Sequence, residues 1–394
     1  MRPRKIKTGI YCVGAIDWDR RLFDALIPLP DGTSYNSYLI KGKEKTALVD
    51  TVDPSMLNVL LGKLGSLGIN KINYVISHHA EQDHSGSIPA MLDKFPTAKV
   101  VCSPRCQELL VELLLLSPDK IKTVADKETL SLGDKTLEFI HTPWVHWPET
   151  MSTYVREDKV LFSCDMFGSH IAQTATFVTD EAQVHESAKR YYAEIMMPFR
   201  RNVISNVEKL KDYNIGVIAP SHGPCYDKPG FIIDAYREWT SDTPKNIVVM
   251  PYVSMHGSTH RMVAYLNDAL AARGVAVKQF DMTSADLGKL AMSLVDAATV
   301  VIGTPTVLAG PHPLMVNAAF LANLLRPITR FATIIGSYGW GGKTVEQITA
   351  LLPNLKVEVL TPVLCKGYPK EADFQALDKM ADTIAAKHKE AGLY

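Results

Sequence analysis

The segment that most constrains this chain is Ser77-His78-His79-Ala80-Glu81-Gln82-Asp83-His84-Ser85-Gly86. It follows the apolar run 72–76, which is typical of a buried strand. A dense group of imidazole and carboxylate donors is therefore expected where a strand passes into a loop, and such loops commonly carry functional sites. Taken alone, the segment is also compatible with a polar loop that is merely rich in histidine and acid.

The spacing of these donors predicts two binding directions. Residues two apart in an extended chain point the same way, so His79 and Glu81 are expected to converge on one ion. Asp83 and His84 can then serve a second ion. Ser87-Ile88-Pro89 is typical of a helix start with proline in the first turn, and it predicts that the chain bends just after His84.

Three further donors lie at the ends of apolar runs elsewhere in the chain. Asp165 follows the run 160–164, His222 follows the run 217–221, and His146 lies in the tryptophan-containing segment 144–149. Their placement matches that of the first segment. The resulting set of seven donors suits two ions.

The pattern resembles the metallo-β-lactamase superfamily, whose hydrolases carry His-x-His-x-Asp-His after a strand. Glu81 replaces the middle histidine here, and a carboxylate at that position favours an iron-type ion over zinc. The form His-x-Glu-x-Asp-His is similar to that of the flavodiiron proteins, also called A-type flavoproteins. The resemblance covers essentially the whole chain and includes residues 33–40, Trp147-Pro148, residues 161–165 and residues 221–224.

The flavodiiron resemblance implies a role for each donor. One iron would be held by His79, Glu81 and His146, the other by Asp83, His84 and His222, and Asp165 would bridge them. Members of the family often read Phe-His-Gly-Tyr near the first strands, where this chain has Phe23-Asp24-Ala25-Leu26. We expect that difference to bear on proton supply or gas preference. The flanking His78, His141 and His170 are interpreted as ordinary core or surface histidines, with a supporting role behind the ligands as the alternative.

Residues 1–242 are predicted to form the metal domain. Strands are expected at 9–18, 35–40, 46–50, 99–102, 137–141, 152–155 and 159–164, and helices at 56–67, 104–115 and 181–213. The resemblance implies that this domain is a metallo-β-lactamase-like αββα sandwich.

Residues 243–394 show a different, regular alternation of strands and helices after a linker at 243–245. Strands are expected at 247–253, 275–280, 298–303, 331–336 and 356–360, and a helix at 259–273. This alternation predicts a doubly wound parallel sheet of the flavodoxin type, with its ligand at the carboxyl ends of the strands.

Three loops at those strand ends are expected to bind flavin mononucleotide (FMN). Their candidate residues are Ser254, Met255, His256, Gly257, Ser258 and Thr259, then Thr304, Pro305, Thr306, Val307 and Gly310, and finally Ser337, Tyr338, Gly339, Trp340, Gly341 and Gly342. The first loop offers hydroxyl and backbone N–H groups at a helix start but no lysine, which suits a monophosphate better than a triphosphate. Trp340 or Tyr338 offers a flat face to an isoalloxazine ring. Beyond their place near the flavin, His256, His260 and His312 are interpreted as ordinary histidines.

Composition limits the class of protein. A length of 394 residues predicts about two domains. Lys plus Arg and Asp plus Glu each number 42, so no general field favours nucleic acid or anionic lipid as a partner. The chain shows no signal-peptide pattern and no run of membrane-spanning length. Six scattered cysteines with no Cys-x-x-Cys pair are interpreted as reduced thiols of a cytoplasmic protein that lacks its own rubredoxin-type iron site.

These features predict an oxidoreductase that uses FMN and two iron ions to reduce dioxygen to water, nitric oxide to nitrous oxide, or both. Electrons would come from a rubredoxin or a reduced deazaflavin. The resemblance also implies a head-to-tail homodimer, or a dimer of such dimers, that sets the flavin of one subunit against the irons of its partner. Two alternatives remain at this point: a zinc-dependent hydrolase of the metallo-β-lactamase type fused to a flavodoxin domain, and an electron carrier or scaffold whose metal half is only structural.

Overall fold

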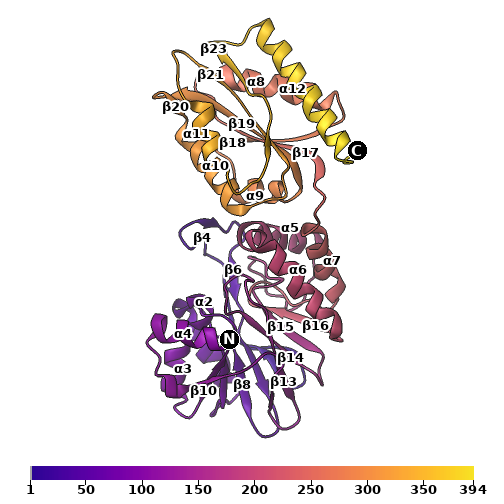
Figure 1. Cartoon of the computed structure of the whole chain (residues 1–394). Coiled ribbons are helices and arrows are strands. Elements are labelled where there is room, and N and C mark those ends of the chain that lie inside the picture. The colour runs from indigo at the N-terminus through magenta and orange to yellow at the C-terminus, as the bar shows by residue number, and fades with distance from the viewer. Residues whose placement is uncertain (1) are drawn as a thin grey trace. The chain divides into compact units, whose positions relative to one another are not determined.

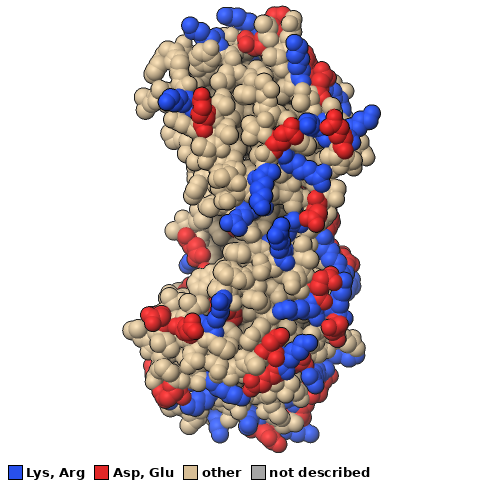
Figure 2. Space-filling model, viewed as in Figure 1, with Lys and Arg blue, Asp and Glu red and all other residues tan. Residues whose placement is uncertain are grey.

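The structure, a computed structural model, describes residues 2–394. The chain divides into two compact units between Thr240 and Ser241. Within the described residues, no helix combines the length and the apolar character that a bilayer crossing requires. Basic and acidic side chains both occur on the viewed face of each unit (Figure 2), in keeping with the balanced composition.

The first unit is built on two sheets (Figure 1). The seven-stranded sheet has the order β1 (Arg4–Lys7), β2 (Ile10–Cys12), β7 (Tyr38–Lys41), β8 (Thr46–Val49), β9 (Tyr74–Ile76), β10 (Lys99–Cys102) and β11 (Ile121–Thr123). The five-stranded sheet has the order β12 (Thr129–Ser131), β13 (Thr136–His141), β14 (Met151–Val155), β15 (Val160–Cys164) and β16 (Val217–Pro220). Two short pairs complete the unit, β3 (Ala15–Asp17) with β6 (Thr33–Tyr35) and β4 (Leu22–Phe23) with β5 (Ile27–Pro28).

Successive apolar residues of the first sheet face two different cores, because side chains alternate along a strand. Leu48 and Val75 belong to the core shared with the outer helices. Their neighbours Val49 and Ile76 belong to the core shared with the second sheet, which includes Phe139. The near-continuous apolar character of these strands follows from burial on both faces.

Helices cover the outer faces of both sheets. Those that precede the second sheet in the chain are η1 (Pro54–Met56), α1 (Leu57–Ser66), α2 (Gln82–Ser85), α3 (Ile88–Lys94), α4 (Pro104–Leu114) and η2 (Pro118–Lys120). Those in the later part are α5 (Glu181–Tyr191), η3 (Tyr192–Met196), η4 (Met197–Phe199), α6 (Arg200–Lys209), η5 (Leu210–Asp212) and α7 (Pro229–Trp239). Figure 1 shows α3 and α4 beside the first sheet and α5 to α7 beside the second. The expected αββα sandwich is confirmed.

Two predicted strands are each broken in the structure. The run 9–18 forms β2 and β3, and the run 35–40 forms the end of β6 and most of β7. Both breaks lie at one contact, where the amides of Val13 and Gly14 donate to the carbonyl of Ser37 at 2.8 and 3.1 Å. A Cβ atom at Gly14 would lie 2.1 Å from the carbonyl oxygen of Tyr35, so only glycine permits this approach.

The single helix expected at 181–213 is also interrupted. A π-helical turn and a 3₁₀ turn separate α5 from α6. Pro198 lies in the 3₁₀ turn and lacks the N–H that a continuous helix needs.

The second unit is a doubly wound parallel sheet, as predicted. Its order is β18 (Ala276–Asp281), β17 (Lys245–Tyr252), β19 (Ala297–Val307), β21 (Phe331–Tyr338) and β22 (Glu358–Val359), with β20 (Gly310–Pro311) beside β19 and β23 (Val363–Lys366) beside β21. The helices are α8 (Ser258–Ala271), α9 (Leu287–Asp296), α10 (Pro313–Leu325), α11 (Thr344–Ala350) and α12 (Glu371–Glu390). In Figure 1, α8 and α12 lie on one face, and α9 to α11 lie on the other. The fifth strand, expected at 356–360, is shortened to β22, and pairing with β21 resumes in β23, beyond the expected range.

Candidate functional site

The histidine-rich segment leaves β9 and turns into the short helix α2. Glu81 precedes this helix in an extended conformation, with φ −59° and ψ 141°. Asp83 and His84 lie inside α2, where the amide of His84 donates to the carbonyl of Glu81 at 3.0 Å. The sequence predicted a bend just after His84. In the structure the bend comes earlier, at Glu81, because the helical turn already begins at Gln82. This early turn aims the two pairs of donors in different directions.

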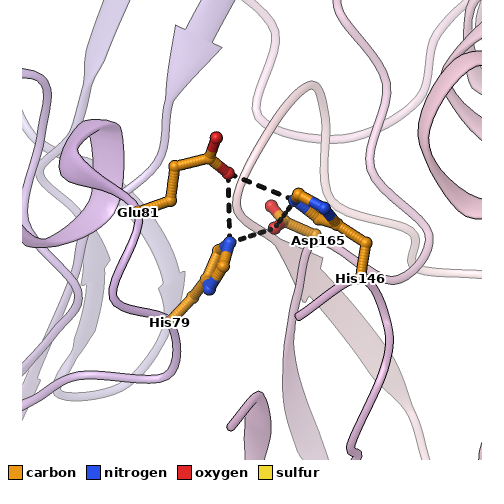
Figure 3. Close-up of side chains that lie close together, drawn as sticks. All are labelled: His79, Glu81, His146 and Asp165. Carbon is orange, nitrogen blue, oxygen red and sulfur yellow. Dashed lines mark hydrogen bonds and ion pairs between the residues drawn. The ribbon is translucent and has the colours of Figure 1, made fainter. Parts of the chain in front are cut away.

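Four side chains converge in one group (Figure 3), which we call the first half-site. It consists of His79, Glu81 and His146 together with Asp165. Glu81 Oε2 lies 3.0 Å from His79 Nε2 and 3.1 Å from His146 Nε2. Asp165 Oδ2 lies 3.5 Å from each of the same two nitrogens.

A second group, the second half-site, adjoins the first. It consists of Asp83, His84 and His222. Asp83 places one carboxylate oxygen 3.3 Å from His84 Nε2 and the other 3.3 Å from His222 Nε2. Asp165 faces this group through Oδ1, at 3.2 Å from His84 and 3.4 Å from His222. The carboxylate of Asp165 thus presents one oxygen to each half-site.

Burial of so many carboxylates and imidazoles together destabilises the fold unless positive charge is present among them. The side chains of His79 and Asp165 are at most 1% exposed, whereas Glu81 and His146 are about 15% exposed and form the open edge. Within residues 2–394, neither oxygen of Asp83 or of Asp165 has a hydrogen-bond partner. Buried carboxylates of this kind require a cation or protons. A mixed set of carboxylates and imidazoles suits iron-type ions.

The pKa values of the buried groups also indicate that the carboxylates require positive charge nearby. Burial alone would raise the pKa of Asp165, but the positive charge on His84 and the facing imidazoles of His146 and His222 hold it well below its usual value. Burial alone would lower the pKa of His84, but the negative charges of Asp165 and Asp83 raise it to about 10. In metal-free protein the His84 imidazole therefore retains its proton, and this positive charge takes the place of a metal cation.

Groups behind the half-sites fix two of the imidazole rings. His79 Nδ1 lies 2.7 Å from Glu149 Oε1, and His222 Nδ1 lies 2.7 Å from the carbonyl oxygen of Ser34. Sequence analysis did not single out Glu149, although it ends the Trp-Pro-Glu stretch just after His146. Its role depends on the fold of the loop between β13 and β14, which carries no local signal.

The flanking histidines differ in their surroundings. His78 contacts Asp50 at 2.8 Å and Thr153 at 2.7 Å and is fully buried. His141 Nε2 lies 3.1 Å from the carbonyl oxygen of Val124. His170 alone among the three contacts a donor ring, with its centroid 4.8 Å from that of His222.

The hairpin of β4 and β5 lies at the edge of the site. Its turn holds Asp24 and Ala25 at φ 49° and 53°, and the amide of Leu26 donates to the carbonyl of Phe23 at 3.0 Å. The Phe23 ring packs 6.3 Å from that of His222. Burial, followed by the charge of Glu81 and a hydrogen bond to it, raises the pKa of Asp24 to about 6. The residue that departs from the family pattern is therefore a neighbour of the first half-site.

The second unit has a hollow of about 320 Å³ at the carboxyl ends of β17, β19 and β21. Its lining from the predicted loops comprises Ser254, Met255, His256, Ser258, Pro305, Thr306, Ser337, Tyr338 and Gly339. Gly367 and Tyr368, which sequence analysis did not identify, complete it. Ser258 begins the fourteen-residue helix α8, and a Cβ atom at Gly339 would enter open space. An anionic, flat ligand fits such a combination of helix start and open cradle.

A second hollow of about 350 Å³ shares Thr306 and Tyr338 with the first. Gly341 and Gly342 line it, together with Thr344, Val345, Glu346 and Leu364, four residues that sequence analysis did not identify. Other predicted contacts line neither hollow; they are Gly257, Thr259, Thr304, Val307, Gly310 and Trp340. Trp340 is 73% exposed beside the cradle. His260 contacts Tyr252 and His312 caps α10, so both serve the local fold.

Known proteins resemble the chain over its whole length. Residues 33–223 match the family described as "ODP family beta lactamase". A protein named nitric oxide reductase from Moorella thermoacetica is 35% identical, over 98% of this chain and 99% of its own. A coenzyme F420H(2) oxidase from Methanothermobacter marburgensis is 30% identical, over 97% and 98%.

Solved structures agree with these relatives. The rubredoxin oxygen:oxidoreductase of Desulfovibrio gigas superposes with a TM-score of 0.96 at 31% identity, covering 100% of both chains. The flavodiiron protein of Giardia intestinalis superposes with a TM-score of 0.93 at 30% identity, covering 99% of this chain and 98% of the other. Identity and coverage of this extent confirm the resemblance seen in the sequence, and the chain belongs to the family of flavodiiron proteins, or type A flavoproteins.

Proposed function

We propose that this protein is an oxidoreductase that reduces dioxygen to water, nitric oxide to nitrous oxide, or both, at two irons supplied with electrons by FMN. The observation that carries the proposal is the division of the seven donors into two matched half-sites by the two oxygens of Asp165. Each half-site offers two imidazoles and one carboxylate of its own. The names of the full-length relatives as oxygen or nitric oxide reductases support the choice of reaction.

In this proposal each residue has a definite task. His79, Glu81 and His146 hold one iron, His84, Asp83 and His222 hold the other, and Asp165 bridges them. When bound, the irons and the flavin supply four electrons for dioxygen, or two for the coupling of two nitric oxide molecules. The buried walls exclude water from all sides except the edge formed by Glu81 and His146, where a small gas can enter.

The flavin is proposed to lie in the cradle of the second unit. The start of α8 at Ser258, with the hydroxyl of Ser254, would hold the phosphate without a lysine. Tyr338 and Gly339 would face the ring system, because both line the same hollow. Electrons would reach the flavin from an external donor, a rubredoxin or a reduced deazaflavin, and two relatives bear names that include such donors.

Assembly as a head-to-tail homodimer, alone or as a dimer of dimers, is part of the proposal. Large apolar side chains are exposed around the flavin cradle, namely Met255, Leu308, Trp340 and Tyr368. Others are exposed near the metal site, namely Trp18, Leu22, Leu26 and Trp144. Exposed apolar side chains that gather beside a site mark an interface, and a contact between these two regions would bring one subunit's flavin to its partner's irons.

A mixed dimer tests this arrangement. One subunit carries His146→Ala, which should empty its metal site, and the other carries Ser258→Asp, which should repel the phosphate of FMN. If the flavin serves the partner's irons, the mixed dimer turns over at about half the wild-type rate, whereas each variant alone is inactive. If the flavin serves the irons of its own chain, the mixed dimer is inactive as well.

The reaction itself is tested by anaerobic stopped-flow of the fully reduced protein against each gas. We expect rapid oxidation of flavin and iron with water or nitrous oxide as product, and the faster gas is the preferred substrate. His146→Ala should lose iron and gas reduction but keep FMN. Slow oxidation by both gases, with hydrolysis of test esters or lactams by zinc-loaded protein instead, would contradict the proposal in favour of the hydrolase alternative.

A further inference from the structure

The two half-sites have matched ligands but differ in what lies behind them. In the first half-site, Glu149 Oε1 lies 2.7 Å from His79 Nδ1 and also accepts the amide of Ala80 at 3.0 Å. A carboxylate can only accept here, so Nδ1 carries a proton, and Nε2, which faces Glu81 and Asp165, is the nitrogen that would give up its proton to a metal. Glu149 therefore selects the form of His79 that can bind a metal.

Glu149 is itself held rigidly. It is 2% exposed, and its carbonyl accepts the hydroxyl of Ser103 at 2.7 Å. The same hydroxyl accepts the amide of Cys106, in the first turn of α4. The His79 ring is further enclosed by Trp147, whose ring centroid lies 4.8 Å away in an edge-to-face arrangement. His79 cannot easily turn away from its Nε2-inward position.

Among residues 2–394, no carboxylate lies behind His222 as Glu149 lies behind His79. His222 is oriented by the carbonyl of Ser34, a neutral acceptor. Glu149, by contrast, brings a carboxylate whose second oxygen, Oε2, is buried without a hydrogen-bond partner in residues 2–394. The full negative charge of a carboxylate at low dielectric attracts a nearby cation more strongly than a carbonyl dipole does. A carboxylate behind a metal-bound imidazole also makes that imidazole a stronger donor.

We propose that Glu149 is a positioning residue that makes the two metal sites unequal, so that the half-site of His79, Glu81 and His146 binds the first Fe²⁺ and holds it more tightly. The inference rests on the proposed function, since it assumes that both half-sites bind iron. It goes further by assigning an order of filling and the residue that causes it.

The test is an anaerobic titration of metal-free protein with Fe²⁺ against a competing chelator. Wild-type protein should bind two Fe²⁺ in two steps whose dissociation constants differ by about tenfold or more. Glu149→Gln keeps the shape of the side chain and removes its charge. It should weaken the tighter step by about 10- to 100-fold and leave the weaker step nearly unchanged, so that the two steps merge.

Glu138→Gln is the matched control, because Glu138 is also buried and contacts Arg156 and Tyr213 rather than either half-site. It should leave both steps unchanged. Glu149→Asp keeps the charge on a shorter side chain and should recover part of the tighter step. Chemical denaturation followed by the tryptophan fluorescence of the first unit reports whether each variant folds, and Glu149→Asp carries the test if Glu149→Gln does not fold.

Mössbauer spectra of protein loaded with one ⁵⁷Fe²⁺ provide a second readout. Wild type should give one dominant ferrous quadrupole doublet, and Glu149→Gln should give two, as iron spreads over both half-sites. An unchanged tight step in Glu149→Gln, or equal weakening of both steps, would overturn the inference. Wild-type protein that binds two Fe²⁺ equally overturns this inference alone, whereas protein that binds no Fe²⁺ overturns the proposed function.

Discussion

Asp165→Asn is the substitution whose outcome follows most directly from the site geometry. The carboxylate places Oδ2 at 3.5 Å from His79 and His146 and Oδ1 at 3.2 to 3.4 Å from His84 and His222. An asparagine has one oxygen and one NH₂ group at these positions. Whichever way the amide turns, one half-site keeps a neutral oxygen and the other meets two N–H protons.

The expected loss of iron affinity follows from this difference between the two ends of the amide. The half-site that faces the amide oxygen loses the negative charge of a ligand. Its affinity for Fe²⁺ should fall by at least about 100-fold, the loss of metal affinity seen when a group behind a metal ligand is removed. That loss corresponds to about 2.7 kcal/mol of binding free energy. The half-site that faces the NH₂ group directs positive partial charge at the cation and should not bind Fe²⁺ at all. The variant should therefore hold at most one iron per chain, weakly.

Iron content after anaerobic reconstitution and gel filtration measures this outcome, with chemical denaturation of the first unit as the check on folding. Asp134→Asn is the control, since Asp134 is a surface residue that accepts the amide of Lys43 and should leave both irons in place. Two irons per chain at near wild-type affinity in Asp165→Asn would refute the bridging role and, with it, the division into half-sites.

Three further outcomes concern the flavin cradle and the stability of each unit. Ser258→Asp should lower FMN affinity by at least about 100-fold through repulsion of the phosphate at the start of α8, while iron content stays normal. A flavin fluorescence titration measures this affinity. An unchanged affinity would place the phosphate elsewhere. Phe162→Ala should destabilise the metal-free first unit by about 3–5 kcal/mol, because Phe162 is 1% exposed in the core between the sheets; a loss below about 1 kcal/mol on chemical denaturation would argue against that core. Burial lowers the pKa of His388 to about 4, below its unfolded value of about 6.5. Between these pH values the unfolded chain binds more protons than the folded one. The free energy of unfolding of the second unit should therefore fall by at most about 3 kcal/mol as pH falls through that window. His388→Gln should remove this acid sensitivity, measured as FMN release in urea at pH 7 and pH 4.5, and equal sensitivity in both proteins would rule out His388 as its source.

The sequence was most informative where the chemistry is local in the chain. His79, Glu81, Asp83 and His84 lie within six residues, and the alternation of an extended chain followed by a helical turn is enough to separate them into two directions. The doubly wound second unit was likewise predictable, because each strand and helix carries its own apolar period. In the histidine-rich segment, the difference lies in the bend, which was predicted just after His84 and comes at Glu81.

Features that depend on contacts between segments far apart in the sequence could not be predicted from local patterns. The breaks between β2 and β3 and between β6 and β7 arise from one contact of Gly14 with Ser37. Glu149 acts on His79 across 70 positions of sequence, and nothing in its neighbourhood marks it as an orienting group. Tyr368 reaches the flavin cradle from a loop after β23 that follows no motif.

The central claim is that the first unit holds two irons in the half-sites joined by Asp165 and that the second unit holds FMN. Its most direct test is to purify the protein without oxygen, with ⁵⁷Fe supplied, and to measure iron, zinc and flavin content together with the Mössbauer spectrum. The account predicts two irons and one FMN per chain, with the irons in a coupled pair that His146→Ala abolishes while FMN remains. Protein that is colourless and empty, or filled only with zinc, would contradict it.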